Sequence, residues 1–372
     1  MSTLDLTFFL AFLLSASGLL PPILHQFRMK SVEVGTGNAV NPQNLPEITI
    51  FIPARDEENL LEKKLSNVVD SDYSKSKIKL LIVDSGSIDR TGEIARKFLS
   101  NSAGEISWEV LSLEKPGKSL AVNKALEVID TDFFVMTDVD SFSPPGSIKF
   151  AISRLVSDPT IGAICGKKAT RPKDSMTSYR KKFNELRISE SILDSTPIFE
   201  GSFCAFRTSS VSEGVDPSIN ADDTQLALLS IRNGFRSVMD PKLEFIEPES
   251  NFLRDFRRSI RRAQGISRCF VANRDLRKLD RPFRSFFYHS FYFYIIFPWI
   301  IFGSSALAVL GSSMYISSNS YPYFFPTTLL IFFLIIISFR PVRDFLTGIL
   351  VLLISHALII LRIDLSKWRP IR

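Results

Sequence analysis

Acidic side chains follow three apolar segments of the chain, and their type and spacing indicate a site that needs a positive partner. An Asp in such a turn often caps the next helix, which accounts well for Asp89 and less fully for Asp56. Capping does not explain carboxylates at three strand ends, because their mutual repulsion is costly without a cation or hydrogen-bond donors. The three runs are Pro53-Ala54-Arg55-Asp56-Glu57-Glu58, Asp84-Ser85-Gly86-Ser87-Ile88-Asp89-Arg90-Thr91 and Thr137-Asp138-Val139-Asp140.

A further acidic pair, Asp222-Asp223, opens an amphipathic segment that continues to Asn233-Gly234. A paired carboxylate can have its pKa raised into the range that suits a general base. Helix capping is the competing explanation, since negative charge is favourable at any helix N-terminus.

The elements that must position these residues follow from hydrophobic patterning. Short apolar runs alternate with amphipathic stretches, which predicts an α/β domain with a mostly parallel sheet covered on both faces. Ligands of such sheets bind beyond the carboxyl ends of the strands, so the acidic turns should share one cleft. The predicted strands are Ile48–Pro53, Lys79–Asp84, Ser107–Leu113 and Phe133–Thr137, and the predicted helices are Glu57–Val69, Thr91–Leu99 and Ser119–Ile129.

In order and spacing, these motifs resemble those of the family 2 glycosyltransferases. The resemblance implies a GT-A nucleotide-diphospho-sugar transferase fold with a mostly parallel, Rossmann-like sheet. Pro53 to Glu57 match the family's Pro-Ala-Arg-Asn-Glu-like turn, and Val83 to Thr91 match Val-Asp-Asp-Gly-Ser-x-Asp-x-Thr with Ser85 in place of the second Asp. Asp138 and Asp140 form the Asp-x-Asp motif, and Lys115 to Ala125 is similar to a Gly-Lys-x-x-Ala-x-Asn segment. The similarity extends from about Ile48 to Gly265.

The resemblance also implies roles for individual residues on the donor side. Asp138 would contact the ribose, and Asp140 would bind Mg²⁺ or Mn²⁺ bridging the donor diphosphate. These cations prefer oxygen ligands and often combine one carboxylate with substrate phosphates. Lys118 would act as a point charge near phosphate, although a solvated lysine at a helix start is an alternative. Residues that would hold the donor nucleotide are Pro53, Ala54, Glu57 and Asp84.

On the acceptor side, the resemblance implies that Asp223 is the base that takes the proton from an attacking hydroxyl, which would invert the anomeric centre. Asp222 and the Gly201 turn would lie beside it, although Glu200–Arg207 also fits a plain turn and strand.

The segment Arg257–Gly265 occupies the place of the family's Gln-x-x-Arg-Trp motif. Arg261 matches, whereas Arg258 replaces the Gln and Arg262 replaces the Trp, which argues against processive polymer synthesis. Arg258 and Arg261 could contact either the diphosphate side of the site or lipid headgroups from an interfacial helix.

Apolar segments at both ends predict membrane anchoring. Residues 1–30 contain a run long enough to span a bilayer. A cleaved signal peptide is the rival interpretation, but no basic region precedes the run. Arg28 and Lys30 follow it, which puts the next segment in the cytosol by the positive-inside rule. Residues 31–47 read as a linker, 48–250 as the catalytic domain, 251–284 as basic interfacial helices and 285–372 as a region of about three transmembrane helices. Its apolar runs are Phe286–Leu310, Phe324–Ser338 and Phe345–Leu361, giving four spans in total, although the basic tail then violates the charge rule.

Positive charge is concentrated next to the apolar C-terminal region, since residues 251–284 hold eleven Arg or Lys against three Asp. Anionic lipid headgroups attract such a segment, and no nucleic-acid-binding motif accompanies it. We therefore expect a metal-dependent, inverting glycosyltransferase at the cytosolic membrane face, using a UDP- or GDP-linked sugar and a hydroxyl of a lipid-linked or glycolipid acceptor. A polyprenyl-phosphate glycosyltransferase is the first alternative, followed by a processive polysaccharide synthase and a non-catalytic membrane scaffold.

Overall fold

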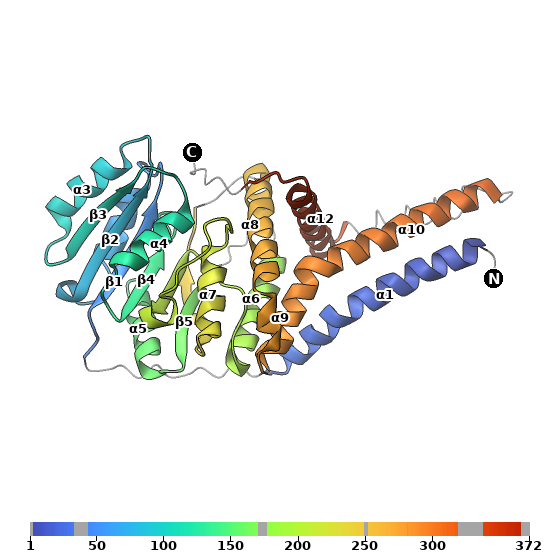
Figure 1. Ribbon diagram of the computed structural model, residues 1–372, viewed down its shortest axis with the longest axis horizontal. Coiled ribbons are helices and arrows are strands. Elements are labelled where there is room, and N and C mark those ends of the chain that lie inside the picture. Colours follow the sequence, from blue (N-terminus) through green and yellow to red (C-terminus); the bar gives the residue numbers. More distant parts are fainter. Residues whose placement is uncertain are drawn as a thin grey trace.

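The computed structural model describes residues 3–32, 44–169, 177–248, 252–280, 282–318 and 338–365. An α/β domain occupies one end, and two long helices project from it side by side as an arm (Figure 1).

A seven-stranded sheet in the order β3-β2-β1-β4-β6-β5-β7 forms the centre of the domain. The first four strands in this order are parallel, β6 is antiparallel to β4 and β5, and β7 is parallel to β5. The mostly parallel sheet predicted from the sequence is therefore confirmed. The strands are β1 (Ile48–Ala54), β2 (Ile78–Ser85), β3 (Ser107–Leu113), β4 (Phe133–Thr137), β5 (Ile161–Lys168), β6 (Phe203–Arg207) and β7 (Arg236–Phe245).

Helices cover both faces of this sheet. Ile48, Ile50 and Ile52 of β1 pack into one apolar cluster with α2, α3 and α5, whereas Phe51 packs into a second cluster with α4, α6 and α7. The alternation follows from the two-residue period of a strand. These helices are α2 (Leu61–Val69), α3 (Thr91–Ser102), α4 (Lys118–Val128), α5 (Ser147–Ser157), α6 (Thr177–Leu193) and α7 (Asp222–Arg232), and short 3₁₀ turns are η1 (Lys75–Lys77) and η2 (Thr208–Ser210).

The predicted strands and helices are found with small shifts, except that α2 begins at Leu61 rather than Glu57. Backbone N–H groups before it are bonded to side chains of the β2 turn, which holds that stretch out of the helix. Pro53 of β1 lacks an N–H group, so it cannot donate a hydrogen bond to a neighbouring strand. Pairing between β1 and β4 ends at Phe51, two residues before Pro53.

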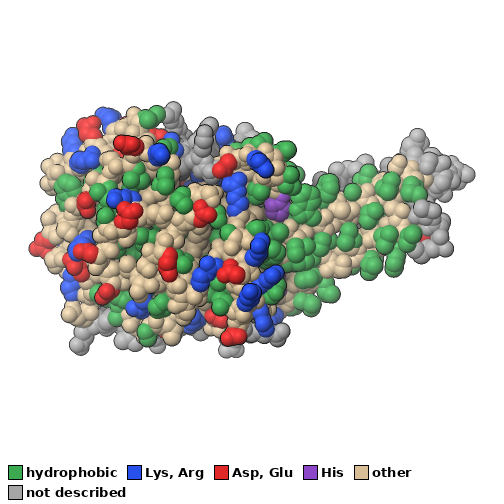
Figure 2. Space-filling model, in the orientation of Figure 1, with side chains coloured by type: hydrophobic (Ala, Val, Ile, Leu, Met, Phe, Trp, Pro, Cys, Tyr) green, Lys and Arg blue, Asp and Glu red, His purple; other side chains and the backbone are tan. Residues whose placement is uncertain are grey.

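The arm consists of α1 (Thr3–Lys30) and α10 (Phe297–Ser318), and α9 (Phe283–Phe291) and the π-helical turn η4 (Tyr292–Ile296) lead into α10. Small residues let the two helices approach: a Cβ on Gly18 would lie 2.6 Å from Ile300, and one on Gly311 would lie 3.1 Å from Phe8. Glycine contacts of this kind are typical of helix pairs in membranes. Apolar side chains cover much of the arm, and most charged ones lie on the domain (Figure 2).

Three helices of the described part are long and apolar enough to cross a membrane: Asp5–Lys30, Phe283–Tyr315 and Arg340–Ile360. The last corresponds to α12 (Arg340–Ile360). The predicted span Phe324–Ser338 lies outside the described residues apart from Ser338, so the prediction of four spans stays a prediction.

Helix α8 (Phe252–Ala272), followed by η3 (Arg274–Lys278), lies between the domain and α12 (Figure 1). Gln264 donates to the carbonyl of Ile363 at 3.0 Å, and Ser267 lies 3.2 Å from the Nε2 atom of His356. A helix with this basic, amphipathic sequence was expected at the membrane interface, and in the structure it packs between the α/β domain and the apolar helix α12.

Candidate active site

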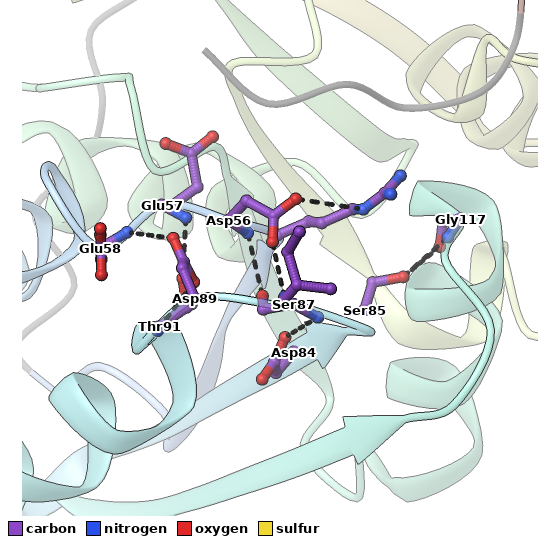
Figure 3. A network of polar contacts seen from close by, with 11 residues as sticks. Asp56, Glu57, Glu58, Asp84, Ser85, Ser87, Asp89, Thr91 and Gly117 are labelled. Carbon is purple, nitrogen blue, oxygen red and sulfur yellow. Dashed lines mark hydrogen bonds and ion pairs between the residues drawn. The ribbon is translucent and has the colours of Figure 1, made fainter. Parts of the chain in front are cut away.

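The turns after β1 and β2 are locked to each other by hydrogen bonds from backbone to side chain (Figure 3). The N–H groups of Asp56, Glu57 and Glu58 donate to Ser87, Thr91 and Asp89 at 2.9, 2.8 and 3.2 Å. Asp56 adopts a positive φ of 50°, which is uncommon for a residue other than Gly, and its carboxylate accepts the N–H of Ile88 at 2.7 Å. The two turns therefore form one rigid edge beyond the strands.

Asp84 and Ser85 close this edge from β2. Asp84 accepts the N–H of Ser87 at 3.0 Å, and a Cβ on Gly92 would lie 2.9 Å from its other carboxylate oxygen, so the glycine leaves the room that this carboxylate needs. Ser85, where the family pattern has Asp, donates to the carbonyl of Gly117 and accepts its N–H. The substitution thus ties β2 to the start of α4.

Two of the predicted donor residues, Pro53 and Ala54, lie at the end of β1. Pro53 and Ala54 are buried inside β1, and Ala54 has no exposed surface. Partly exposed side chains begin at Arg55, because the strand continues through Ala54 and its side chains pack on neighbouring elements. The donor-binding role of Pro53 and Ala54 stays a prediction.

The carboxylates after β4 lie close to Glu57. Burial, followed by the charges of Asp140 and Asp138, raises the pKa of Glu57 to about 8. Burial also raises the pKa of Asp140, and Asp138 and Glu247 add to the effect. These carboxylates therefore repel one another, and the charge of Arg258 opposes the shift at both Glu57 and Asp140.

Lys118, the first residue of α4, joins the Asp-x-Asp motif to the second acidic pair. Its ammonium lies 2.8 Å from Asp138 and 3.3 Å from Asp222. Although burial opposes its charge, Asp138, Asp222 and Asp223 hold the pKa of Lys118 above its usual value. The sequence-based alternative, a solvated lysine, is wrong for this residue.

Asp223 lies at the start of α7 and faces the Gly201 turn. A Cβ on Gly201 would lie 2.7 Å from a carboxylate oxygen of Asp223, so only glycine leaves that carboxylate in place. Burial and then the charge of Asp222 raise the pKa of Asp223 to about 7, although Lys118 opposes the shift. The backbone of Thr224 donates to it at 2.8 Å. These properties suit a general base near neutral pH.

The Gly201 turn lies beside the Asp-x-Asp motif because β6 runs antiparallel to β4. The carbonyl of Ser202 accepts hydrogen bonds from the Thr137 hydroxyl at 3.0 Å and from the Asp138 N–H at 3.3 Å. The acceptor-side turn and the donor-side motif therefore meet at one edge.

Arginines of α8 face this edge. Arg258 donates to Asp140 at 3.0 Å and lies 3.8 Å from Glu247. Burial, together with neighbouring Arg262 and Arg258, lowers the pKa of Arg261 to about 10. Arg261 remains a cation at neutral pH, and an anionic ligand would stabilise it. These arginines were expected to contact either the diphosphate side of the site or lipid headgroups, and Arg258 lies against the site carboxylate Asp140.

Two charged residues of the site, Lys64 and Glu247, were not predicted from the sequence. Lys64 is 1% exposed and donates to the Thr137 hydroxyl at 2.7 Å and the Ser141 carbonyl at 2.5 Å, beneath the Asp-x-Asp turn. Burial lowers the pKa of Lys64 to about 7, against the charges of Asp138 and Asp140. Its signal was available, since Lys64 interrupts the apolar stripe of α2 formed by Leu61, Leu65 and Val68.

Glu247 left no comparable signal. It follows β7, is 5% exposed, accepts the Ser202 hydroxyl at 2.6 Å and pairs with Lys168 at 3.0 Å. Burial opposes its charge, but Arg262, Arg258 and Lys168 hold its pKa well below the usual range.

A divalent cation fits the carboxylates that converge after β4. No group of three or more His, Cys, Asp or Glu residues in the described part of the chain could hold a metal ion alone. Asp140, with Asp138 beside it, would therefore supply few ligands, and phosphate and water would supply the rest.

Comparison with known proteins identifies the domain. The family model described as Glycosyl transferase family 2 matches residues 49–215. The chain is 27% identical over 132 residues to the probable glycosyltransferase YdaM of Bacillus subtilis, covering 34% of this chain and 30% of that protein. It is 26% identical over 178 residues to the poly-beta-1,6-N-acetyl-D-glucosamine synthase of Staphylococcus aureus, covering 46% and 42%. The chain thus spans less than half the length of these curated relatives.

Similarity to a solved structure extends over nearly the whole chain. The mannosyltransferase PcManGT from Pyrobaculum calidifontis, solved in complex with GDP-Man and Mn²⁺, superposes with a TM-score of 0.82 at 25% identity, covering 95% of this chain and 98% of that one. Residues 49–215 therefore form a family 2 glycosyltransferase domain, and the chain has a GT-A fold.

Proposed function

We propose that this glycosyltransferase is metal-dependent and inverting, and that it transfers a sugar from a nucleotide-diphosphate donor to a hydroxyl of a lipid-linked or glycolipid acceptor. The observation that carries the proposal is the Asp223 carboxylate. It faces Gly201, has a pKa of about 7 and is linked through Asp222 and Lys118 to Asp138 of the donor side.

The chemistry balances with one base. Asp223 accepts the proton of the acceptor hydroxyl while the hydroxyl oxygen forms a bond to the anomeric carbon of the donor. The bond from that carbon to the phosphate oxygen breaks, and its electron pair leaves with the nucleoside diphosphate. Attack opposite the leaving group inverts the centre. Lys118 and Arg261 are the fixed cations that would offset the negative charge on the departing diphosphate.

A bound Mg²⁺ or Mn²⁺ would supply additional charge stabilisation for the leaving group. Asp140 is the residue that would hold it, with Asp138 beside it. The presence of Mn²⁺ with the similar mannosyltransferase supports Mn²⁺ as the first ion to test.

GDP-mannose is the first donor to test, because PcManGT was solved with GDP-Man and its similarity covers the arm as well as the domain. A UDP-linked sugar is the second choice. The relatives named as polysaccharide synthases match only part of the chain, and Arg258 and Arg262 stand where the family's processive members carry Gln and Trp.

The arm supports a membrane-bound acceptor. An anchored enzyme meets a lipid-linked acceptor at high effective concentration. Arg28 and Lys30 follow the first span, which favours a cytosolic position for the catalytic domain by the positive-inside rule.

Transfer to a polyprenyl phosphate is the second candidate, since the membrane helices would suit that acceptor equally. A phosphate oxygen is already ionised and needs no base, so this reaction would leave the raised pKa of Asp223 without a use. Full turnover of an Asp223→Asn variant with its natural acceptor would favour the phosphate.

The test incubates the purified full chain in vesicles of extracted membrane lipid with radiolabelled GDP-mannose or a UDP-linked sugar, with Mn²⁺, Mg²⁺ or a chelator. We expect label in the extracted lipid from one donor only, and its loss with the chelator and in Asp140→Asn. Glu127→Gln, the same kind of change at an exposed ion pair with Lys124, is the matched control. Labelled lipid that still forms in the presence of the chelator would contradict metal dependence. Label found in long polymer would indicate a polysaccharide product instead of a glycosylated lipid.

A further inference from the structure

One guanidinium connects two carboxylates that come from different parts of the chain. Arg258 of α8 donates from Nη2 to Oδ2 of Asp140 at 3.0 Å, and its Nη1 lies 3.8 Å from Oε2 of Glu247. Asp140 follows β4, and Glu247 follows β7. An antiparallel bridge between Phe142 and Ile246 brings these two segments together. Arg258 therefore sits where two buried negative charges need a positive partner.

The contact places Arg258 in competition with any cation that Asp140 would bind. Both Asp140 and Glu247 are 5% exposed, so bulk water can solvate neither carboxylate well. A charge-assisted bond from arginine to a buried carboxylate is strong, and a cation that uses the same Oδ2 atom has to replace it. Cation binding through Oδ2 of Asp140 would thus include the cost of moving the guanidinium.

Two partners are available for a displaced Arg258. Glu247 is already within reach and is anchored by Ser202 at 2.6 Å and Lys168 at 3.0 Å. The diphosphate of a donor is the other, because guanidinium groups bind phosphate through two parallel hydrogen bonds. A donor that arrives with its cation would offer the arginine a new anion while the cation takes Asp140.

Helix α8 itself has little freedom to move. A Cβ on Gly265 would lie 1.8 Å from the carbonyl oxygen of Asn220, so the helix backbone is pressed against the loop that precedes Asp222. Its other side is bonded to the α12 end through Gln264. Exchange would therefore involve the Arg258 side chain, which is 23% exposed, rather than the helix.

We propose that Arg258 is a positioning residue that makes cation and donor binding interdependent: it holds Asp140 until a divalent cation and a nucleoside diphosphate bind together. The inference rests on the proposed function, because it needs Asp140 as the cation ligand. It predicts that the chain binds Mn²⁺ weakly alone and strongly with nucleotide, and that Arg258 is the cause of the difference.

The experiment measures Mn²⁺ affinity of the full chain in detergent by electron paramagnetic resonance, with and without GDP or UDP. In Arg258→Gln, which has the family's residue, Mn²⁺ alone should bind about tenfold more tightly, and the gain in affinity on adding nucleotide should shrink by a similar factor. Arg258→Lys keeps a charge near Asp140 and should stay closer to the parent. Arg257→Gln, an exposed position on the same helix, is the matched control.

A second variant predicts the opposite sign. Glu247→Gln removes the alternative partner, so Arg258 should stay on Asp140 and Mn²⁺ alone should bind more weakly than to the parent. Equal Mn²⁺ affinities for the parent, Arg258→Gln and Glu247→Gln would overturn the inference and leave the proposed function intact. If the parent binds no Mn²⁺ even with nucleotide and transfers no sugar, the proposed function fails first.

Discussion

The two sides of the active site hold their carboxylates in different ways. On the donor edge, formed by the turns after β1 and β2, backbone N–H groups are the main partners, as the bonds from Ser87 to Asp84 and from Ile88 to Asp56 show. On the second side, formed by the Asp-x-Asp turn after β4 and the start of α7, the partners are the side-chain cations Lys118 of α4 and Arg258 of α8. Backbone partners fix geometry, whereas side-chain cations can be titrated, exchanged or removed. We therefore expect the donor edge to act as a rigid support and the second side to contain the groups that change during the proposed reaction.

The largest effect is expected at the base. Asp223→Asn keeps the size of the side chain and removes its ability to accept a proton, so kcat should fall by about 10²–10⁴-fold while donor KM changes little. Single-turnover rates with saturating donor measure this directly. Asp84→Asn on the donor edge is the comparison, and it should change donor affinity more than kcat. An Asp223→Asn defect confined to donor KM would reverse the assignment of the two sides.

A smaller loss is expected when the base is displaced rather than removed. The Cβ of Gly201→Ala would lie 2.7 Å from the Asp223 carboxylate, which must then move. A misplacement on the order of 1 Å can cost about 10²-fold in rate. The rate of Gly201→Ala should fall while its Mn²⁺ affinity stays unchanged, because the substitution does not alter the surroundings of Asp140. Gly234→Ala, at a turn where an added Cβ meets nothing within 4 Å, is a control for the added methyl group, although its φ of 84° adds strain.

The pH dependence of kcat should report the environment of Asp223. The carboxylate acts only when deprotonated, and its pKa is about 7, so kcat should rise as the pH increases through 7. Lys118 lowers this pKa, so Lys118→Met should move the midpoint to higher pH by about one unit or more. Steady-state measurements of kcat between pH 5.5 and 9 give the midpoint for the parent and for the variant, and their difference is the shift. An unchanged midpoint in Lys118→Met would mean that another group limits the profile.

The same contrast explains how much the sequence could predict. Glu57, Asp84 and the Asp-x-Asp pair belong to short motifs next to strands, so they could be located from local pattern and sheet topology. The contact between Arg258 and Asp140 joins residues 118 positions apart, and nothing local in the sequence fixes it. Glu247 was missed for the same reason. Burial was a further limit, since the buried state of Ala54 depends on how neighbouring elements pack on β1.

The smallest effect is expected on the donor edge itself, at the position where the chain departs from the family pattern. Ser85 is fully buried, and its hydroxyl serves both backbone groups of Gly117, accepting the N–H at 2.8 Å and donating to the carbonyl at 3.0 Å. Ser85→Ala leaves the N–H of Gly117 without this partner, whereas the carbonyl keeps the N–H of Ala121 at 3.0 Å, so the loss in the free energy of unfolding should be about 1–3 kcal/mol. Thermal unfolding in detergent should show a decrease of a few degrees with little change in kcat.

Ser85→Asp, which restores the family residue, separates local fit from family pattern. A carboxylate cannot donate to the Gly117 carbonyl and would face it at close range, so this variant should be less stable than Ser85→Ala. Ser100→Ala, an exposed serine that donates only to the Arg96 carbonyl, is the matched control. If Ser85→Asp were as stable as the parent, the segment before α4 would have to shift. The donor edge would then be less rigid than its backbone hydrogen bonds indicate, and the contrast between the two sides would weaken.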